Sequence, residues 1–203
     1  MRLDAGSGRS AITDQERLWD FISFMPADGS HPAFQEFPHC TVGIGPVDAE
    51  AMITFPHRMP PARRKRLHGE SFEEFTARLE TANTALRRAL KGLKGYCPMI
   101  RVMQRRYKTQ RSVPLMDGRV EFDLRATFGE PKPHFGPPIK KQPQWARAAY
   151  DLLVNKRSNI QFQIGVAFYY PQFDELAHKD ADRYFVAAFK ALRPFAAPVI
   201  DAS

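Results

Sequence analysis

Two arginine-rich segments contain the residues of this sequence that are best suited to binding chemistry. The first contributes Arg58, Arg63, Arg64, Lys65 and Arg66, and the second contributes Arg101, Arg105, Arg106, Tyr107, Lys108 and Arg111. A guanidinium group is a planar fork that fits a phosphate, and a tyrosine ring can stack on an unpaired base. The combination predicts binding to single-stranded or structured nucleic acid, or to another polyanion. Groove readout is disfavoured, because the sequence contains no recognition helix, RNP sequence or zinc-finger spacing.

The charge distribution agrees with this interpretation. Residues 56–111 contain 15 basic and 4 acidic side chains, whereas residues 1–55 contain 3 basic and 8 acidic ones, and the net charge of the chain is +8. A basic block attracts nucleic acid, but also an acidic protein surface, and the acidic first part of the chain could itself be the partner. A second hypothesis is therefore an interaction or structural subunit of a larger assembly, such as a phage- or plasmid-type accessory factor or a homo-oligomer.

A histidine motif provides a third hypothesis. The segment Phe37-Pro38-His39-Cys40-Thr41-Val42 resembles one of the two His-x-Thr motifs of the 2H phosphoesterases. That resemblance would imply a phosphodiester-cleaving enzyme in which His39 acts as acid or base while Thr41 binds phosphate. None of the other five histidines is followed by a second such motif. A strand histidine that is hydrogen-bonded near the edge of the core accounts for the same residues, so we expect a binding protein rather than an enzyme.

Two further groups of residues could bind a metal ion. The spacing of Asp117, Glu121, Asp123 and Arg125 is similar to the Mg²⁺ site of restriction-type nucleases, but the usual Glu-x-Lys is absent. Cross-strand ion pairing with Arg101 or Arg105 explains these carboxylates equally well. The spacing of His39, Cys40, His57 and His68 matches no zinc finger or ribbon. We therefore expect no metal and no cofactor.

Length and composition indicate one soluble domain. The chain has 203 residues, 43% of them hydrophobic and 26% charged, with 16 phenylalanines. The start of the sequence lacks the apolar region of a signal peptide, and no apolar run is long enough to span a bilayer. The two cysteines, Cys40 and Cys97, form no paired motif. These features predict a cytoplasmic protein with a flexible arm at residues 1–12 and a single domain at residues 13–203.

Hydrophobic periodicity, capping boxes and turn residues predict the elements that position these groups. Helices are expected at residues 13–25, opened by Thr13, at 71–92, opened by Ser71, and at 144–156 and 174–192. Strands are expected at residues 39–44, 51–55, 99–107, 120–128 and 159–170, with a hairpin turn at Asp117-Gly118. Prolines predict an exposed loop at residues 56–70 and an extended crossover at 129–143. This order predicts an α+β fold in which a mainly antiparallel sheet packs against helices on one face.

Overall fold

The protein is described from a computed structural model that covers residues 2–4, 20–25, 36–45, 47–105, 116–132, 137–155, 160–170 and 182–200. For residues 2–4, 20–25, 105 and 116–118 only the backbone is described. The strands are β1 (Arg2–Asp4), β2 (Asp20–Met25), β3 (His39–Ile44), β4 (Asp48–Phe55), β5 (Tyr96–Arg105), β6 (Met116–Asp123) and β7 (Ile160–Tyr169). The helices are α1 (Pro61–His68), α2 (Phe72–Ala89), the 3₁₀ helix η2 (Leu124–Thr127), α3 (Pro143–Asn155) and α4 (Asp182–Ile200).

The strands form one sheet in the order β1-β2-β3-β4-β7-β5-β6, and each pair of neighbours is antiparallel. Strand β7 is the last of the described strands in the sequence but lies in the middle of the sheet. It separates the β1–β4 meander from the β5–β6 hairpin. The predicted α+β fold with a mainly antiparallel sheet is confirmed.

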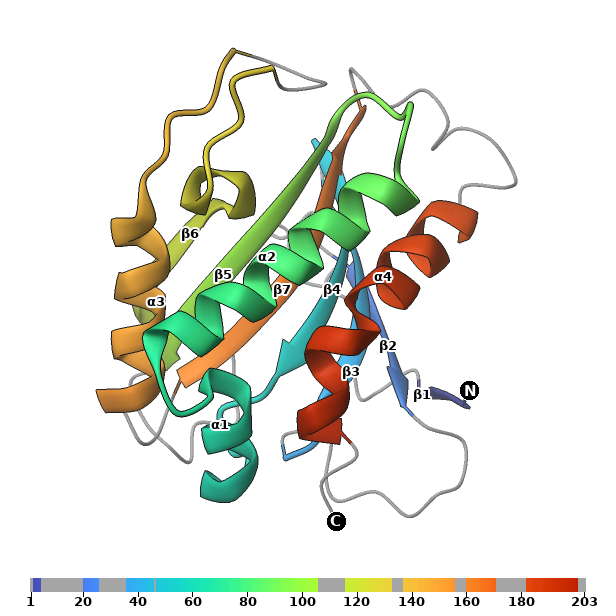
Figure 1. The fold of residues 1–203 in the computed structure, drawn as a ribbon. Helices are drawn as coiled ribbons and strands as arrows, with labels where there is room; N and C mark the ends of the chain where they lie inside the picture. The colour runs from blue at the N-terminus through green and yellow to red at the C-terminus, as the bar shows by residue number, and fades with distance from the viewer. Residues whose placement is uncertain are drawn as a thin grey trace.

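The helices cover one face of the sheet (Figure 1). Alternate residues of the central strands, among them Phe55, Ile100, Phe162 and Phe168, are buried in the core that the helices close. The opposite face is polar in its centre, because the intervening positions of the same strands carry Thr54, Arg101 and Gln163 (see below). None of the helices in the described part of the chain has the length and apolarity needed to cross a bilayer.

Several predicted elements are confirmed, and the reasons are local. Ser71 is the N-cap of α2, where its hydroxyl accepts the backbone N–H of Glu74, as the capping box predicts. The Glu74 carboxylate accepts the backbone N–H of Glu70 in return. The hairpin of β3 and β4, strand β7 and helix α3 lie within a few residues of their expected positions.

The prediction for the first residues was wrong where the structure describes them. Residues 20–25, expected to end a helix, form strand β2, which pairs with β3 from Asp20 opposite Ile44 to Phe24 opposite Cys40. The aromatic and β-branched composition of this segment suits a strand, and the ladder outweighs the weak helical period. Residues 2–4, expected in a flexible arm, form β1 and pair with β2. Residues 5–19, including the capping box at Thr13, lie outside the described residues.

The expected exposed loop at residues 56–70 is also corrected, because residues 61–68 form helix α1. The prolines that argued for a loop instead start the helix: Pro60 is the N-cap and Pro61 the first helical residue, where the missing N–H costs nothing. Gly69 ends the helix with φ of +73°, and its N–H donates to the carbonyl of Lys65.

Two boundaries around β6 differ from the prediction. Asp117 and Gly118, expected to form a turn, lie within β6 beside a register shift, with Gly118 opposite Gln104. Strand β6 stops at Asp123 rather than at residue 128, because the Asp123 carboxylate accepts the backbone N–H of Arg125 at 2.8 Å and caps η2.

The last helix extends further than expected. Helix α4 runs to Ile200 and contains Pro194 and Pro198, whereas its end was expected at residue 192. Burial of Phe195 and Val199 against the core compensates for the hydrogen bonds that the prolines cannot make. On the same helix, Val186 is 45% exposed. The start expected at residue 174 lies outside the described residues.

Candidate anion-binding surface

The strand order brings the two predicted basic segments to one end of the sheet. Strands β4 and β5 are both antiparallel to β7, which lies between them, so β4 and β5 run parallel to each other. Phe162 of β7 pairs with Phe55, the last residue of β4, and with Val102, close to the end of β5. The chain therefore leaves both strands at the same end, about 10 Å apart across two strand spacings.

Helix α1 follows β4 at this end and is the most basic element of the described chain. It contains Arg63, Arg64, Lys65 and Arg66 and no acidic residue. Lys65 and Arg66 are exposed in its last turn, where cations complement the helix dipole. Lys65 lies 3.0 Å from the Glu70 carboxylate, but both side chains are largely exposed, so this pair holds the ammonium only weakly.

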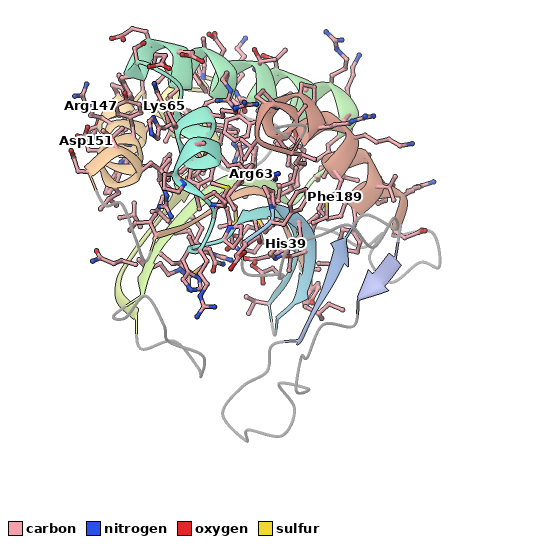
Figure 2. The ribbon with its side chains drawn as sticks, turned by 90° about the horizontal axis from the view of Figure 1, so that it is seen from below. His39, Arg63, Lys65, Arg147, Asp151 and Phe189 are labelled. Atoms are coloured by element: carbon pink, nitrogen blue, oxygen red, sulfur yellow. The ribbon has the colours of Figure 1, made fainter. Side chains whose placement is uncertain are left out.

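The other cations of this segment are less exposed. The Arg63 guanidinium lies 4.8 Å from the centre of the Phe37 ring, in cation–π contact. In Figure 2, which looks onto α1, Arg63 lies toward the sheet and Lys65 lies on the helix side. Arg58 is half-buried, and Arg64 is only 6% exposed. Of the five predicted residues, Lys65 and Arg66 are thus the most exposed, and Arg58 is partly accessible.

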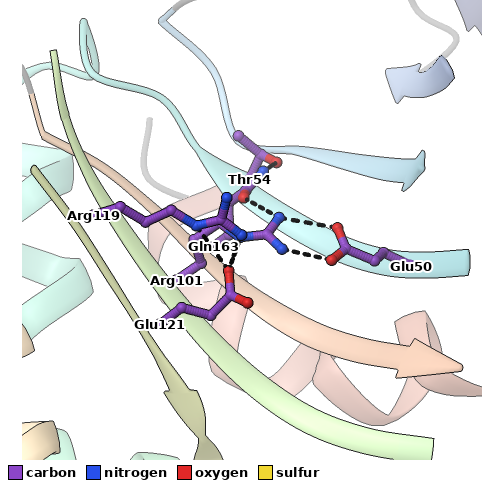
Figure 3. Close-up of polar contacts among 6 residues, drawn as sticks. All are labelled: Glu50, Thr54, Arg101, Arg119, Glu121 and Gln163. Carbon is purple, nitrogen blue, oxygen red and sulfur yellow. Dashed lines mark hydrogen bonds and ion pairs between the residues drawn. The ribbon is translucent and has the colours of Figure 1, made fainter. Parts of the chain in front are cut away.

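Arg101, predicted to bind anions, is buried and paired within the protein. It is 5% exposed, and its Nη1 donates to the Glu50 carboxylate at 2.9 Å. Its Nε donates to Glu121, directly opposite it on β6 (Figure 3). Two carboxylates thus occupy the guanidinium, so Arg101 is removed from the anion-binding surface. The alternative that Glu121 serves in cross-strand pairing with Arg101 is confirmed.

The remaining residues of the second segment cannot be placed on a surface. The backbone of Arg105 ends β5, but its side chain is not described. Arg106, Tyr107, Lys108 and Arg111 lie outside the described residues. Their anion binding stays a prediction that follows from their types and from where β5 ends.

The histidine motif is part of a polar row that crosses the sheet. In register, His39, Thr54, Gln163, Arg101 and Glu121 lie side by side on β3, β4, β7, β5 and β6. Gln163 accepts from Arg101 at 3.2 Å and donates to Thr54 at 2.9 Å, as Figure 3 shows. This row lies on the face opposite the helices.

His39 has the environment of a structural residue. It is 4% exposed, and its Nδ1 lies 2.9 Å from the carbonyl oxygen of Phe37. Burial lowers the pKa of its imidazole to about 4, so the ring is neutral near pH 7. The hydroxyl of Thr41 lies 3.2 Å from that of Thr54. The two side chains on which the phosphoesterase resemblance rests therefore have structural contacts.

The candidate metal ligands pair with arginines. The Asp123 carboxylate accepts from Nη2 of Arg125 at 2.7 Å, while Glu121 accepts from Arg101 and Arg119. Burial alone would raise the pKa of Glu121, but the hydrogen bonds from Arg101 and Arg119 outweigh it and keep that pKa below its usual value. Within the residues that the structure describes, no group of three or more His, Cys, Asp or Glu side chains could hold a metal ion.

The structure also contains an open pocket that the sequence did not predict, near the start of β5 and the end of β7. Its volume is about 570 Å³, and its lining includes Cys97, Asp123, Arg125 and Tyr169. Burial raises the pKa of both Cys97 and Tyr169 to about 12, so the thiol and the phenol remain protonated near pH 7. The aromatic run at residues 168–170 was the available sequence signal: Tyr169 lines the pocket, whereas Phe168 is buried in the core.

Comparison of the chain with protein-family models, with curated proteins and with solved structures gives no significant match.

Proposed function

We propose that this protein binds nucleic acid or another polyanion through a basic surface formed by Arg58, Lys65 and Arg66, called here the α1 surface. The observation that carries the proposal is the β4-β7-β5 strand order. Because of it, the segment that leads into α1 and the segment that continues from Arg105 leave the sheet at the same end. The start of the basic helix α1 and the end of β5 are thereby close together at one end of the sheet.

The charge balance of α1 supports the proposal. No acidic side chain in α1 offsets its cations, and Glu70 is the one carboxylate within 4 Å of the Lys65 ammonium among the described residues. A phosphodiester chain would displace this weak pair and release its own counterions, which favours binding at low salt. Because Arg101 is buried, it does not belong to the proposed surface. The described residues of that surface are therefore Arg58, Lys65 and Arg66.

The proposal is tested with two triple variants that remove the same charge. In Arg58→Gln/Lys65→Gln/Arg66→Gln the α1 surface is neutralised. In the control, Arg88→Gln/Lys91→Gln/Lys94→Gln, three exposed cations are lost near the end of α2, which precedes the start of β5 and so lies at the opposite end of the sheet.

Binding of a fluorescent single-stranded oligonucleotide and of a duplex is measured by anisotropy across a salt series. We expect the α1 variant to bind more weakly, with the slope of log affinity against log salt reduced by about 2 for the single strand. The control variant should keep most of the slope. Equal effects of both variants, or no binding by the unmodified protein at low salt, would contradict the proposal.

One observation favours the second hypothesis, a protein-binding subunit. Ile44 and Val47, near the turn between β3 and β4, are 53% and 59% exposed. Exposed apolar side chains at one turn are suited to contact with another protein. Purification with and without nuclease separates the two proposals: a polyanion-binding protein loses absorbance at 260 nm and native mass on treatment, whereas a subunit keeps its partner or oligomeric mass.

A further inference from the structure

The open pocket at the end of β7 lies between two parts of the chain that are distant in sequence. One side is formed by strand ends, with Cys97 near the start of β5, Asp123 at the end of β6 and Tyr169 at the end of β7. The other side is a wall formed by residues 137–140 and 142. The volume of about 570 Å³ is within the range of about 300–1,000 Å³ that is usual for sites of small organic ligands.

Backbone hydrogen bonds hold this wall in place. Ile139 and Glu130 exchange two of them, of 2.9 and 2.8 Å, and the N–H of Gln142 donates to the carbonyl of Ala126 at 2.6 Å. The two prolines at the start of the wall have a fixed φ, which further limits its conformations. A ligand therefore meets a wall that is already formed, so binding requires little additional ordering of the chain.

The charges of Asp123 and Arg125 in the lining compensate each other. Asp123 accepts from Nε and Nη2 of Arg125 at 3.0 and 2.7 Å, and Nη1 of Arg125 lies 3.1 Å from the Glu130 carboxylate. That carboxylate also lies 3.6 Å from Nε of Arg87 on α2. Two carboxylates and two guanidiniums thus balance. Arg125 is only 3% exposed, so this group forms a fixed polar floor without net charge.

The carboxylates whose charges act on the phenol of Tyr169 lie outside the lining. Glu50 and Glu121 both accept from Arg101. Burial raises the pKa of Asp48, so this carboxylate takes up a proton more readily than usual. The uncompensated charge in the lining itself is therefore that of its one lysine.

The polar groups of the lining that remain available are hydrogen-bond donors. The Tyr169 hydroxyl makes no hydrogen bond within the described part of the chain, and it remains protonated near pH 7. Trp145 Nε1, which can only donate, donates to Oε1 of Gln142 at 2.8 Å, so the N–H₂ group of that amide is left to donate. The Lys140 ammonium is exposed and pairs with no carboxylate among the described residues. A ligand that satisfies these groups must supply acceptors.

We propose that this pocket binds a small organic carboxylate with a planar or apolar body. The carboxylate accepts from the Lys140 ammonium and from the neutral donors of the lining, while the body packs against the prolines and Ile139 of the wall and the ring of Tyr169. One cation matches the single charge of a carboxylate, whereas a phosphate monoester carries about −1.5 to −2 at pH 7. The site lies at the end of β7 opposite to the α1 surface and does not depend on polyanion binding.

Benzoate, benzamide and benzylamine test the ligand class, because they share a ring and differ in the charge of the head group. Isothermal titration calorimetry at pH 7 measures the affinity of the unmodified protein for each. We expect benzoate to bind about fivefold or more tightly than either analogue, a factor expected for hydrogen bonds to a charged group when one donor is an exposed lysine. Acetate, which lacks the ring, should bind more weakly than benzoate. Equal affinities for the three ring compounds, tighter binding of phenyl phosphate, or no binding of benzoate overturns the carboxylate assignment.

Two variants locate the binding. Lys140→Gln removes the charge and Tyr169→Phe removes the hydroxyl, and each should weaken benzoate binding about threefold or more. Tyr170→Phe and Lys190→Gln are matched controls, since the Tyr170 hydroxyl donates to the carbonyl of Gly45 and Lys190 is exposed on α4. Both controls should bind benzoate as the unmodified protein does. Unchanged affinity in either pocket variant, or an equal loss in the controls, overturns the pocket as the site.

Discussion

Whether a basic side chain is exposed or buried in an ion pair depends on the residues that the fold places beside it. Its position in a basic segment of the sequence does not decide this. Lys65 and Arg66 are exposed, whereas Arg101 is buried because register places Glu121 opposite it and Glu50 two strands away. The sequence predicted the charge density and its two segments. It could not predict which cations form ion pairs within the protein. Glu50 is 51 residues distant from Arg101 in the chain and comes close to it only through strand pairing.

His39 provides a prediction at this scale. Its pKa is about 4 in the folded protein and near 6.5 when unfolded. Above pH 6.5 the imidazole is neutral in both states, so its contribution to stability is fully present. Between pH 6.5 and 4 only the unfolded chain takes up the proton, so stability should fall by up to about 1.4 kcal/mol per pH unit.

His39→Asn places an amide nitrogen where Nδ1 meets the Phe37 carbonyl, without a titrating group. Urea unfolding of both proteins across a pH series checks this. We expect the difference in unfolding free energy between the unmodified protein and the variant to shrink or reverse from pH 6.5 to 4. A difference that is constant with pH would show that His39 is not buried as a neutral ring.

At the scale of elements, patterns with one dominant local cause were predicted well. Helix α2 has a capping serine, ordered charges and a regular apolar stripe, and β7 has a large apolar residue at every second position from Ile160 to Phe168. Prediction failed where position in the sheet decides. Residues 20–25 form β2 because β3 offers an edge, and α4 passes through Pro194 because its apolar face is buried. The interactions that stabilise β2 and α4 are made with residues that are distant in sequence, so a local pattern does not show them.

Gly165 gives a prediction for the contact between strands β4 and β7. A Cβ atom added there would lie 2.7 Å from the Cα of Met52 and would also collide with the carbonyl oxygen of Ala51. Because these obstacles are backbone atoms, β4 and β7 cannot move apart without breaking the hydrogen bonds between them. We expect Gly165→Ala to lower the free energy of unfolding by about 3 kcal/mol.

Gly92→Ala is the control, since an added Cβ meets nothing within 4 Å there and only the φ of +86° is unfavourable. Its expected cost is about 1 kcal/mol. Chemical denaturation of both variants measures the difference. A Gly165→Ala loss no larger than that of Gly92→Ala would mean that the two strands separate without strain.

At the scale of the whole molecule, the polar row ties together the two halves of the sheet. Glu50 belongs to the β1–β4 meander, Gln163 to β7 and Glu121 to the β5–β6 hairpin, and all three accept from Arg101 (Figure 3). The helix-covered face holds the same strands together by apolar packing. On the polar face, Arg101 thus links the meander, β7 and the hairpin, which apolar packing links on the helix-covered face.

Arg101→Met tests this role. The substitution leaves Glu50, which is 3% exposed, as a buried carboxylate without its cation, so the expected loss of unfolding free energy is about 3 to 5 kcal/mol. Arg101→Met/Glu50→Leu removes both charges and should recover most of that loss. Lys65→Met, at an exposed cation, should change stability by less than about 0.5 kcal/mol. Urea denaturation of the three variants checks the order, and a double variant no more stable than Arg101→Met would refute the pairing argument.

The central position of β7 has a consequence for biosynthesis. Until residues 160–169 have emerged from the ribosome, the β1–β4 meander and the β5–β6 hairpin cannot join, and β4 and β5 each present an unpaired edge. Such edges recruit strands of other nascent chains. We therefore expect chains arrested before residue 160 to aggregate or to recruit chaperones, and chains arrested after β7 is exposed to become protease-resistant together with α2.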